Sequence, residues 1–238
     1  MSDEKDFLSG YDPGDFPAFA VTADIVLLTM RAGRLCVLLI ERGGPPFEGM
    51  WAFPGGFVRP DENLDQAASR ELREETGISG IDLTQFSSYG DPDRDPRMRV
   101  VTVSYLAVVP DLPSPEASSD AARARFWPVD DVEGTLAFDH DRILGDALSH
   151  LRTVVEYSPL AASFCEREFT IADLRRVYES IWGIDLDPSN FQRKVLGIEE
   201  FLEPTDRQSR SPEGGGRPAR LYRLGKVTEL RPPILRPD

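Results

Sequence analysis

Apolar residues in the first half of the chain form short runs that are typical of β-strands. Two such runs, Val21–Met30 and Arg34–Arg42, are separated only by a short turn at residues 31–33. Residues 64–76 show helical spacing instead and end at Gly77, which suits a left-handed cap. Three more apolar runs predict strands at Leu83–Tyr89, Arg99–Val109 and Ala124–Pro128. Strands and helix mixed without strict alternation predict an α+β domain with a mixed sheet.

The segments around these runs lack periodicity. Residues 1–17 carry Asp, Gly and Pro and predict a loose N-terminal arm. Residues 43–56 are too rich in Gly and Pro for a regular element, and residues 110–120 form a polar loop rich in Pro and Ser. We therefore assign the first domain to residues 18–138.

The spacing becomes helical after Asp139. An apolar stripe runs through residues 143–155 and predicts packing either against the first domain or across a dimer. No long Gly/Ser linker follows it, so we expect any second domain to be coupled rigidly to this helix. We assign residues 139–160 to a connecting helix and residues 161–238 to a second domain.

The second domain has two helix starts with clear capping signals. Thr170 and Asp173 resemble a capping box, and Gly183 ends the helix that they begin. Asp187 followed by Pro188 predicts an N-cap with proline at the first helical position. The second helix would bury Phe191, Val195 and Leu196 and would present Ser189, Asn190, Gln192, Arg193 and Lys194 outward. Two capped helices with these outward residues are typical of a helix-turn-helix.

The end of the chain predicts a wing. Residues 199–205 and 219–224 would pair as a hairpin around an arginine-bearing loop at residues 206–217. Phosphates would attract Arg207, Arg210, Arg217 and Arg220, whereas Asn190, Gln192 and Arg193 would lie nearer the base edges. A small helical interaction domain without a nucleic acid partner is the alternative.

The distribution of charge changes this picture. The chain of 238 residues has a formal net charge of −14, but within Arg207–Arg236 eight basic residues stand against two acidic ones. Such asymmetry suggests a polyanionic partner for the second domain, although a solvated basic tail explains it equally well. The apolar runs are far shorter than the ~20 residues of a membrane span, and the first residues show no signal-peptide pattern. Cys36 and Cys165 fit neither a disulfide framework nor a zinc finger, so we expect a cytoplasmic protein with reduced thiols and no membrane partner.

The predicted helix at residues 64–76 carries carboxylates on one face. They are Glu71, Glu74 and Glu75. Like charges at these spacings repel one another, and acids near a helix C-terminus oppose the macrodipole. Hard oxygen ligands crowded in this way suit Mg²⁺ or Mn²⁺ that bridges to phosphates. Arg70 would orient the cluster, and Gly55 and Gly56 would let backbone amides approach a phosphate, unless the helix face is simply solvated.

The same segment matches a fixed pattern, Gly-x5-Glu-x7-Arg-Glu-U-x-Glu-Glu-x-Gly-U, in which U is apolar. The matching residues are Gly56, Glu62, Arg70, Glu71, Leu72, Glu74, Glu75, Gly77 and Ile78. The segment therefore resembles a complete Nudix box. This resemblance implies an α/β/α sandwich with a mixed sheet and a site for a nucleoside diphosphate linked to another group. It also implies a catalytic set with Glu71, Glu74 and Glu75 as metal ligands and with Glu62 and Arg70 in support.

A second segment, residues 89–108, bears on the identity of the ligand. Arg94, Arg97 and Arg99 lie at the start of a predicted strand, and guanidinium groups suit phosphate recognition. Pairing with neighbouring aspartates is an equal alternative. Residues 89–108 also resemble the corresponding stretch of ADP-ribose pyrophosphatase-like Nudix proteins and their regulatory relatives. That resemblance makes ADP-ribose the leading ligand, with NAD or another nucleotide sugar as alternatives.

Two further roles follow from residue type. Trp51, Phe53 and Tyr105 are able to stack on adenine, although aromatic residues at such positions are more often core. Hydrolysis also needs a general base, for which Glu116 and Asp120 in the polar loop are the candidates.

Residues 169–224 resemble the winged-helix half of NrtR, the Nudix-related transcriptional regulators of NAD metabolism. The resemblance implies a homodimer that binds operator DNA, represses NAD-synthesis or NAD-salvage genes and responds to ADP-ribose. Two alternatives remain. One is a magnesium-dependent hydrolase that cleaves ADP-ribose to AMP and ribose 5-phosphate, and the other is a regulator that slowly hydrolyses its own effector. The complete box permits hydrolysis, and we favour the repressor.

Overall fold

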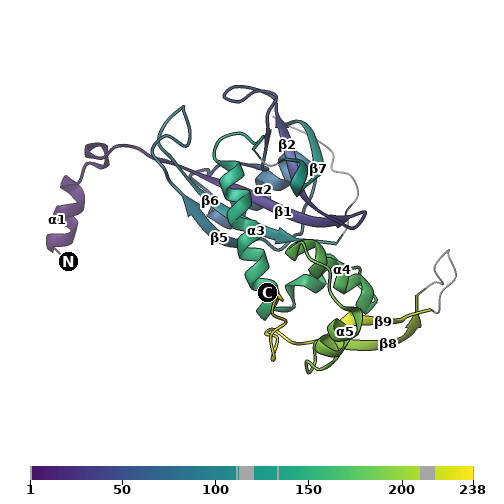
Figure 1. Ribbon diagram of the computed structural model, residues 1–238. Coiled ribbons are helices and arrows are strands. Elements are labelled where there is room, and N and C mark those ends of the chain that lie inside the picture. The colour runs from purple at the N-terminus through teal and green to yellow at the C-terminus, as the bar shows by residue number, and fades with distance from the viewer. Residues whose placement is uncertain (1, 111, 113–120, 133, 210–217, 238) are drawn as a thin grey trace.

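The apolar runs of the first domain pair into one mixed sheet (Figure 1). The computed structural model describes residues 2–110, 112, 121–132, 134–209 and 218–237. The strands are β1 (Ala20–Arg31), β2 (Arg34–Arg42), β3 (Trp51–Ala52), β4 (Gly55–Phe57), β5 (Thr84–Tyr89), β6 (Val100–Val108) and β7 (Ala121–Pro128). Their order is β3-β2-β1-β6-β5, with β4 paired to β1 and β7 to β2. The β1–β6 pair is parallel and the other pairs are antiparallel, which confirms the predicted mixed sheet.

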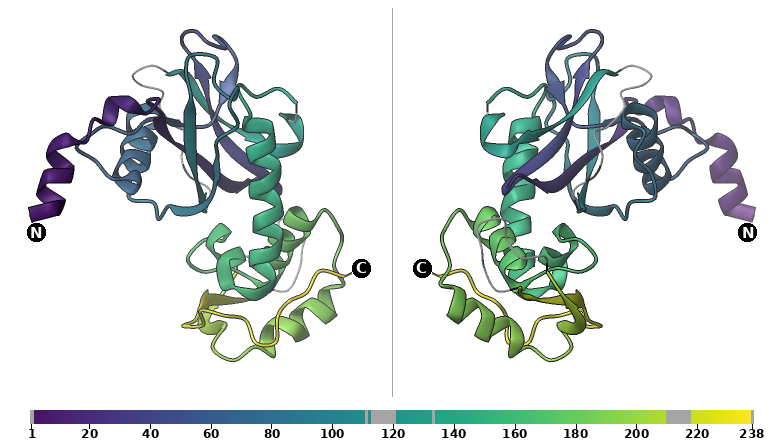
Figure 2. Two further views of the ribbon diagram at one scale, coloured as in Figure 1. Left: turned by 90° about the vertical axis from the view of Figure 1, so that its left-hand side faces the viewer. Right: turned by 90° about the vertical axis from the view of Figure 1, so that its right-hand side faces the viewer.

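Helices cover both faces of this sheet (Figure 2). Helix α2 (Leu64–Thr76) packs Ala68 and Leu72 into the core on one face. Helix α3 (His140–Tyr157) packs Ile143 and Leu151 into the core on the other face. The predicted α/β/α sandwich is therefore confirmed. A short 3-10 turn, η2 (Val129–Asp131), leads from β7 toward α3.

The second domain is a winged helix-turn-helix, as predicted. Its elements are η3 (Pro159–Phe164), α4 (Ile171–Trp182), α5 (Pro188–Leu196), β8 (Leu202–Gln208) and β9 (Arg220–Leu224). The capping box of Thr170 and Asp173 starts α4, and Gly183 ends it with a φ of 69°. The side chain of Asp187 accepts from the amide of Asn190 and starts α5. Local capping signals therefore fix both helices.

The two domains share one apolar core. Leu28 from the sheet, Leu151 from α3 and Tyr178 from α4 belong to the same cluster of buried residues. Leu230 and Ile234, near the end of the chain, are buried in it as well. The stripe on α3 therefore packs within the chain, against both domains at once. Along the described residues, no helix combines the length and the apolar character that a membrane crossing needs.

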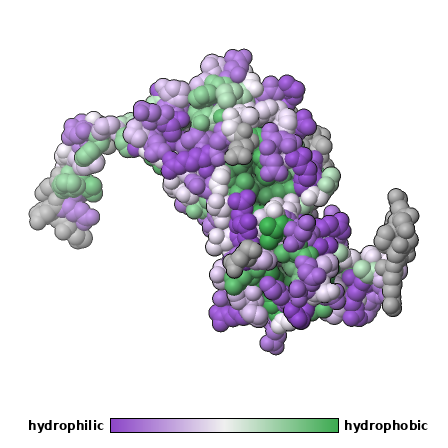
Figure 3. Space-filling view, viewed as in Figure 1, coloured by the Kyte–Doolittle hydropathy of each residue, from purple (hydrophilic) through white to green (hydrophobic). Residues whose placement is uncertain are grey.

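Two predicted irregular segments contain regular elements. The arm forms helix α1 (Ser2–Gly10) and a 3-10 turn, η1 (Pro13–Asp15), although its composition predicted no regular element. The arm extends away from the body, and Figure 3 shows apolar side chains along it. Phe7 and Leu8, in α1, are 66% and 63% exposed. The loop at residues 43–56 contains β3 and the start of β4, because their backbones pair with β2 and β1.

Replacing Thr170 with alanine tests the capping of α4. The hydroxyl of Thr170 accepts from the amide of Asp173 at 3.1 Å. Loss of such a cap lowers the free energy of unfolding by about 1 kcal/mol. Urea unfolding of the full chain, followed by tryptophan fluorescence, measures the change. Thr153→Ala, in the middle of α3, is the matched control and should leave stability nearly unchanged, because alanine favours a helix interior.

Candidate functional site

Helix α2 carries the acidic residues of the Nudix box. A reciprocal capping box between Asn63 and Gln66 fixes its first turn, and Gly77 ends it with a φ of 73°. Glu75 is buried, and its carboxylate accepts a hydrogen bond of 2.8 Å from the amide of Gly55. The two caps therefore fix the helix ends and, with them, the direction of the acidic side chains.

Arg70 links three of these acidic residues. Its side chain is 9% exposed and donates to Glu62 at 2.8 Å, to Glu71 at 2.6 Å and to Glu74 at 3.2 Å. It also donates to the carbonyl of Phe57 at 3.1 Å. The hydrogen bonds from Arg70 lower the pKa of Glu62 to about 2. Arg70 thus orients carboxylates that would otherwise repel one another.

Glu74 does not converge with the other two predicted metal ligands. Its carboxylate lies 3.3 Å from Arg59 and 3.2 Å from Arg70. Among the residues that the structure describes, no three His, Cys, Asp or Glu side chains are gathered as metal ligands would be. In this structure the two guanidinium groups hold Glu74 apart from Glu71 and Glu75, and the shared metal role of the three carboxylates stays a prediction.

Glu71 and Glu75 nevertheless create an environment that favours a cation. Burial raises the pKa of both carboxyl groups, that of Glu75 to about 8, and the charge of Glu71 adds to the shift of Glu75. A side chain at Gly56 would overlap the carboxylate of Glu71, so glycine leaves the room that this group occupies. Hard carboxylate oxygens are the ligands that Mg²⁺ and Mn²⁺ prefer. The residues present therefore fit a divalent cation held by Glu71 and Glu75.

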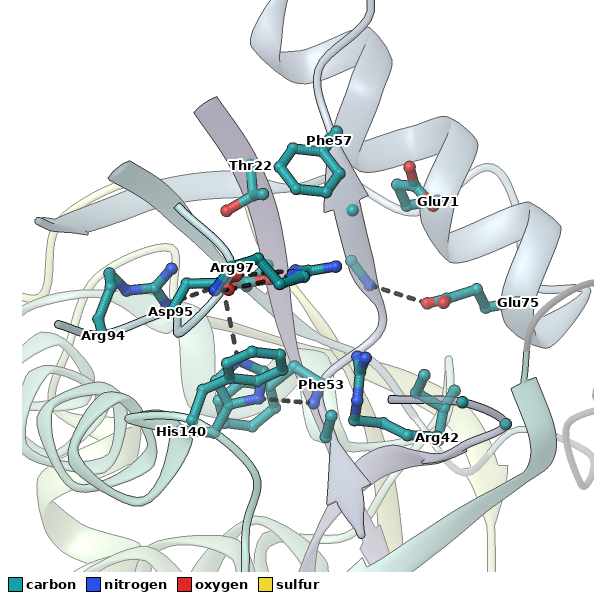
Figure 4. A pocket seen from close by; sticks show the side chains of 18 of the residues that line it. Thr22, Arg42, Phe53, Phe57, Glu71, Glu75, Arg94, Asp95, Arg97 and His140 are labelled. Carbon is teal, nitrogen blue, oxygen red and sulfur yellow. Dashed lines mark hydrogen bonds and ion pairs between the residues drawn. The ribbon is translucent and has the colours of Figure 1, made fainter. Parts of the chain in front are cut away.

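These carboxylates face a cavity of about 780 Å³. Figure 4 shows Glu71 and Glu75 on one side of it and the side chains of Arg42 and Arg97 between the sheet and the helix. Burial and the nearby charge of Arg97 lower the pKa of Arg42. Arginine side chains opposite a cation site suit a ligand with a diphosphate. Its negative charge would neutralise both the arginines and the cation.

The three predicted arginines have different surroundings. Arg94 is buried in the cavity wall and forms a bidentate ion pair with Asp139. Arg97 lines the cavity and pairs with Asp95 at 2.7 Å. This contact fits the alternative prediction that these arginines pair with neighbouring aspartates. Arg99 lies over the ring of Phe19 at 5.2 Å and is not among the described residues that line the cavity. The structure therefore brings two of the three to the cavity.

The predicted adenine-stacking residues differ in their position relative to the cavity. The ring of Phe53 is buried and stacks on His140 at 4.7 Å. Trp51 packs against Trp127 at 5.2 Å, and the buried Tyr105 donates to Asp65. Phe53 lines the cavity, whereas Trp51 and Tyr105 are not among the described residues that line it. A stacking role toward adenine therefore stays a prediction. The rings of Phe57 and Phe138 line the cavity as well.

Sequence reasoning missed several cavity residues. Asp24 in β1, Arg42 in β2, and Phe138 and His140 at the start of α3 all line it. A single carboxylate within the apolar run of β1 was the available signal. Burial lowers the pKa of His140, so this side chain is neutral at pH 7.

In the second domain, α5 presents the predicted polar face. Its outward residues Ser189, Asn190, Gln192, Arg193 and Lys194 are all exposed. Arg193 donates to the side chain of Asn190 at 2.8 Å. Phe191 and Val195 are buried as predicted, whereas Leu196 is 47% exposed, so its predicted burial was wrong.

Two of the four arginines predicted for the wing, Arg207 and Arg220, lie in its strands within the described ranges. Arg207 pairs with Glu168 at 2.8 Å, and Arg223, from the paired strand, binds the same carboxylate. Arg220 is exposed at the start of β9. The other predicted residues, Arg210 and Arg217, lie outside the described residues, as do the candidate bases Glu116 and Asp120.

A Nudix sandwich followed by a winged helix-turn-helix defines a class of protein that joins a nucleotide-binding fold to a DNA-binding one. Residues 18–147 match the family described as NUDIX domain, and residues 161–224 match the family described as NrtR DNA-binding winged helix domain. The ADPR responsive transcriptional repressor NtrR of Acinetobacter baylyi is 35% identical, over 94% of this chain and 89% of its own. The chain belongs to the NrtR family.

Solved structures of a second relative show the same architecture. The structure of Shewanella oneidensis NrtR complexed with a 27mer DNA is similar with a TM-score of 0.75 and 31% identity, over 88% of this chain and 99% of that one. The NUDIX domain of the same relative, complexed with ADP ribose, is similar with a TM-score of 0.58 and 36% identity, over 62% of this chain and 98% of that one.

Proposed function

We propose that this protein is a transcriptional repressor that binds operator DNA through its winged helix and ADP-ribose through its Nudix domain. The observation that carries the proposal is the similarity, over nearly the whole chain, to a repressor described as ADPR responsive. The exposed polar face of α5 and the arginines of the wing support the DNA-binding part. By resemblance, we infer that it regulates NAD-synthesis or NAD-salvage genes in the cytoplasm.

The cavity supports ADP-ribose as the effector. Arg42 and Arg97 suit its phosphates, and Glu71 and Glu75 suit a Mg²⁺ or Mn²⁺ ion that neutralises the diphosphate. The ring of Phe57, which also lines the cavity, suits its base. NAD and other nucleotide sugars share the diphosphate, so the terminal group would decide between them. A homodimer would place two α5 helices on a two-fold symmetric operator.

Titration of labelled double-stranded DNA from upstream of the protein's own gene tests this proposal. We expect saturable binding whose affinity changes by about fivefold or more at saturating ADP-ribose with Mg²⁺, the lower end of ordinary allosteric coupling. Adenosine, which lacks the diphosphate, is the control and should leave the affinity unchanged. An unaltered DNA affinity at saturating ADP-ribose would overturn the effector assignment.

Hydrolysis of ADP-ribose to AMP and ribose 5-phosphate is a second candidate function, which the complete Nudix box favours. Nudix hydrolases generally use divalent metal ions, and such an ion would polarise the diphosphate. Arg70 would hold Glu71 in place for it. In a Mg²⁺-dependent assay, Glu71→Gln should release AMP at least about a hundredfold more slowly than wild type. A loss of this order is expected when one charged group at a reaction centre is removed. The matched control is Asp82→Asn, which removes an exposed charge in the same domain. Equal AMP release by wild type and both variants would refute the metal assignment.

A further inference from the structure

Three consecutive residues at the start of α3 connect that helix to the cavity. Phe138 lines the cavity and has a φ of 57°, a left-handed conformation that non-glycine residues rarely adopt. The guanidinium groups of Arg42 and Arg97 lie over its ring, at 4.9 Å and 5.9 Å from the ring centre. It also meets the ring of Phe47 edge-on at 4.7 Å. Phe138 therefore combines a strained backbone with contacts to both side chains that would bind a diphosphate.

The next residue, Asp139, occupies the N-cap position of α3 without capping it. No side-chain hydrogen bond from Asp139 caps the helix. Its carboxylate accepts two hydrogen bonds from Arg94 instead, at 3.0 Å and 2.7 Å. The side chain of Arg94 is 4% exposed, lines the cavity and also lies 3.6 Å from Asp24. A buried, bidentate pair thus ties the first turn of α3 to the cavity wall.

His140 adds a second connection. Its Nδ1 accepts a hydrogen bond of 3.0 Å from the amide of Phe53, and its Nε2 lies 3.7 Å from the carboxylate of Asp24. The same carboxylate accepts from the hydroxyl of Thr102 at 2.6 Å. Figure 4 shows His140 stacked on Phe53 at the base of the cavity. Because these groups are buried and mutually bonded, a displacement of one requires a displacement of the others.

The other end of α3 is bonded to the winged helix. The indole of Trp182 donates to the carbonyl of Arg152 at 3.5 Å, and Arg152 donates to the carbonyl of Ile181 at 3.1 Å. The hydroxyl of Tyr178 donates to the carbonyl of Val155 at 3.0 Å. These bonds join the last turns of α3 to α4, the helix that precedes α5. A helix of 18 residues thus spans from the cavity to the DNA-binding domain.

We propose that the segment Phe138–His140 couples the cavity to the winged helix, with the Arg94–Asp139 pair as its essential contact. The inference rests on the proposed function and assigns the route of its regulation. A diphosphate ligand that attracts Arg94 changes the pairing of Asp139. A ligand that attracts Arg97 changes the packing of Phe138. Helix α3 then shifts as a unit, and α4 and α5 move with it. The ligand acts because it binds more tightly to the arrangement in which the Arg94–Asp139 pair is changed than to the arrangement in which it is intact.

Asp139→Asn tests the coupling, because Asp139 holds Arg94 without lining the cavity itself. Three quantities are measured by anisotropy titration and calorimetry on the full chain with Mg²⁺. They are the DNA affinity without ligand, the ADP-ribose affinity without DNA, and the ratio of DNA affinities with and without saturating ADP-ribose. We expect the first two to stay within about threefold of wild type and the ratio to fall below about twofold.

Asp91→Asn is the matched control. Asp91 pairs with Arg142 at 2.5 Å, so this exposed ion pair also joins the loop before β6 to the first turn of α3. It is exposed and faces no cavity group, and we expect the wild-type ratio in this variant. An equal loss in Asp91→Asn and Asp139→Asn would overturn the specific role of the Arg94–Asp139 pair.

The failures of the two proposals are distinguishable. If wild type shows no effect of ADP-ribose on DNA affinity, the proposed function and the coupling both fail. If wild type responds and Asp139→Asn keeps the full ratio, the coupling alone is overturned. Should Asp139→Asn not fold, Phe138→Gly replaces it, since glycine accepts the positive φ and removes the ring. A wild-type ratio in Phe138→Gly then overturns the coupling, and a ratio below about twofold supports it.

Discussion

Replacing Arg193 with alanine is expected to weaken operator binding by about ten- to a hundredfold, which corresponds to the loss of one base-edge contact. Arg193 lies on the exposed face of α5, where Asn190 holds its guanidinium at 2.8 Å. The opposite face of α5 is anchored by the buried Phe191 and Val195, so the helix keeps its place when Arg193 is shortened. The loss of affinity would therefore come from the contact with DNA and not from unfolding.

Fluorescence anisotropy with labelled operator DNA at one fixed salt concentration measures this change. Arg73→Ala removes the same charge from an exposed position on α2 in the other domain, where the side chain is 60% exposed. Its affinity should match wild type. If Arg193→Ala and Arg73→Ala behave alike, α5 is not the recognition helix. Arg220→Ala, on the wing, should instead weaken binding to all DNA sequences equally. It should also reduce the slope of log affinity against log salt concentration by about one unit.

Local signals explain why the helices of both domains were predicted well. Thr170 and Gly183 delimit α4, Asp187 begins α5, and Gly77 ends α2, each through contacts within one or two turns. The spacing of Nudix-box residues works in the same way, because a helix converts spacing directly into a shared face. Glu62, Arg70 and Glu71 therefore lie together in the structure as the pattern implied.

The cavity could not be predicted in the same way, because its residues come from elements far apart in the chain. Asp24 and His140 meet only after β1 and α3 have packed against each other. The short strands β3 and β4 depend on pairing with β2 and β1, so tertiary contacts override the Gly- and Pro-rich composition of that segment.

The aromatic residues show the same limit. Which face a strand residue occupies follows from register, which a run of apolar residues on both faces does not define. Tyr105 was a plausible ligand contact by residue type, yet its position in β6 directs it into the core and its hydroxyl to Asp65. Charge had a similar effect on Glu74, since Arg59 comes from outside the helix that set our expectation.

The affinity for Mg²⁺ is expected to rise by about tenfold per pH unit up to the pKa of Glu75 and then to level off. Burial raises that pKa to about 8 from an ordinary value of 4.5. A protonated carboxyl group is a poor ligand for a cation, so binding requires loss of this proton. Calorimetric titration with Mg²⁺ between pH 6 and pH 9 measures the slope and the position of the plateau. Asp82→Asn, an exposed charge removal, should reproduce the wild-type profile.

The metal-free protein should show the opposite dependence in its stability. Between pH 4.5 and pH 8 the folded chain keeps a proton on Glu75 that the unfolded chain releases. The contribution of Glu75 to the free energy of unfolding therefore falls as the pH rises through this window, and it is level above it. Glu75→Gln carries a neutral isostere, so this contribution to the slope should disappear together with Mg²⁺ binding. If Glu75→Gln keeps the Mg²⁺ affinity and its pH profile, the cation is held elsewhere. If it loses both while DNA binding without ligand is unchanged, the cation site belongs to the effector cavity and not to the fold.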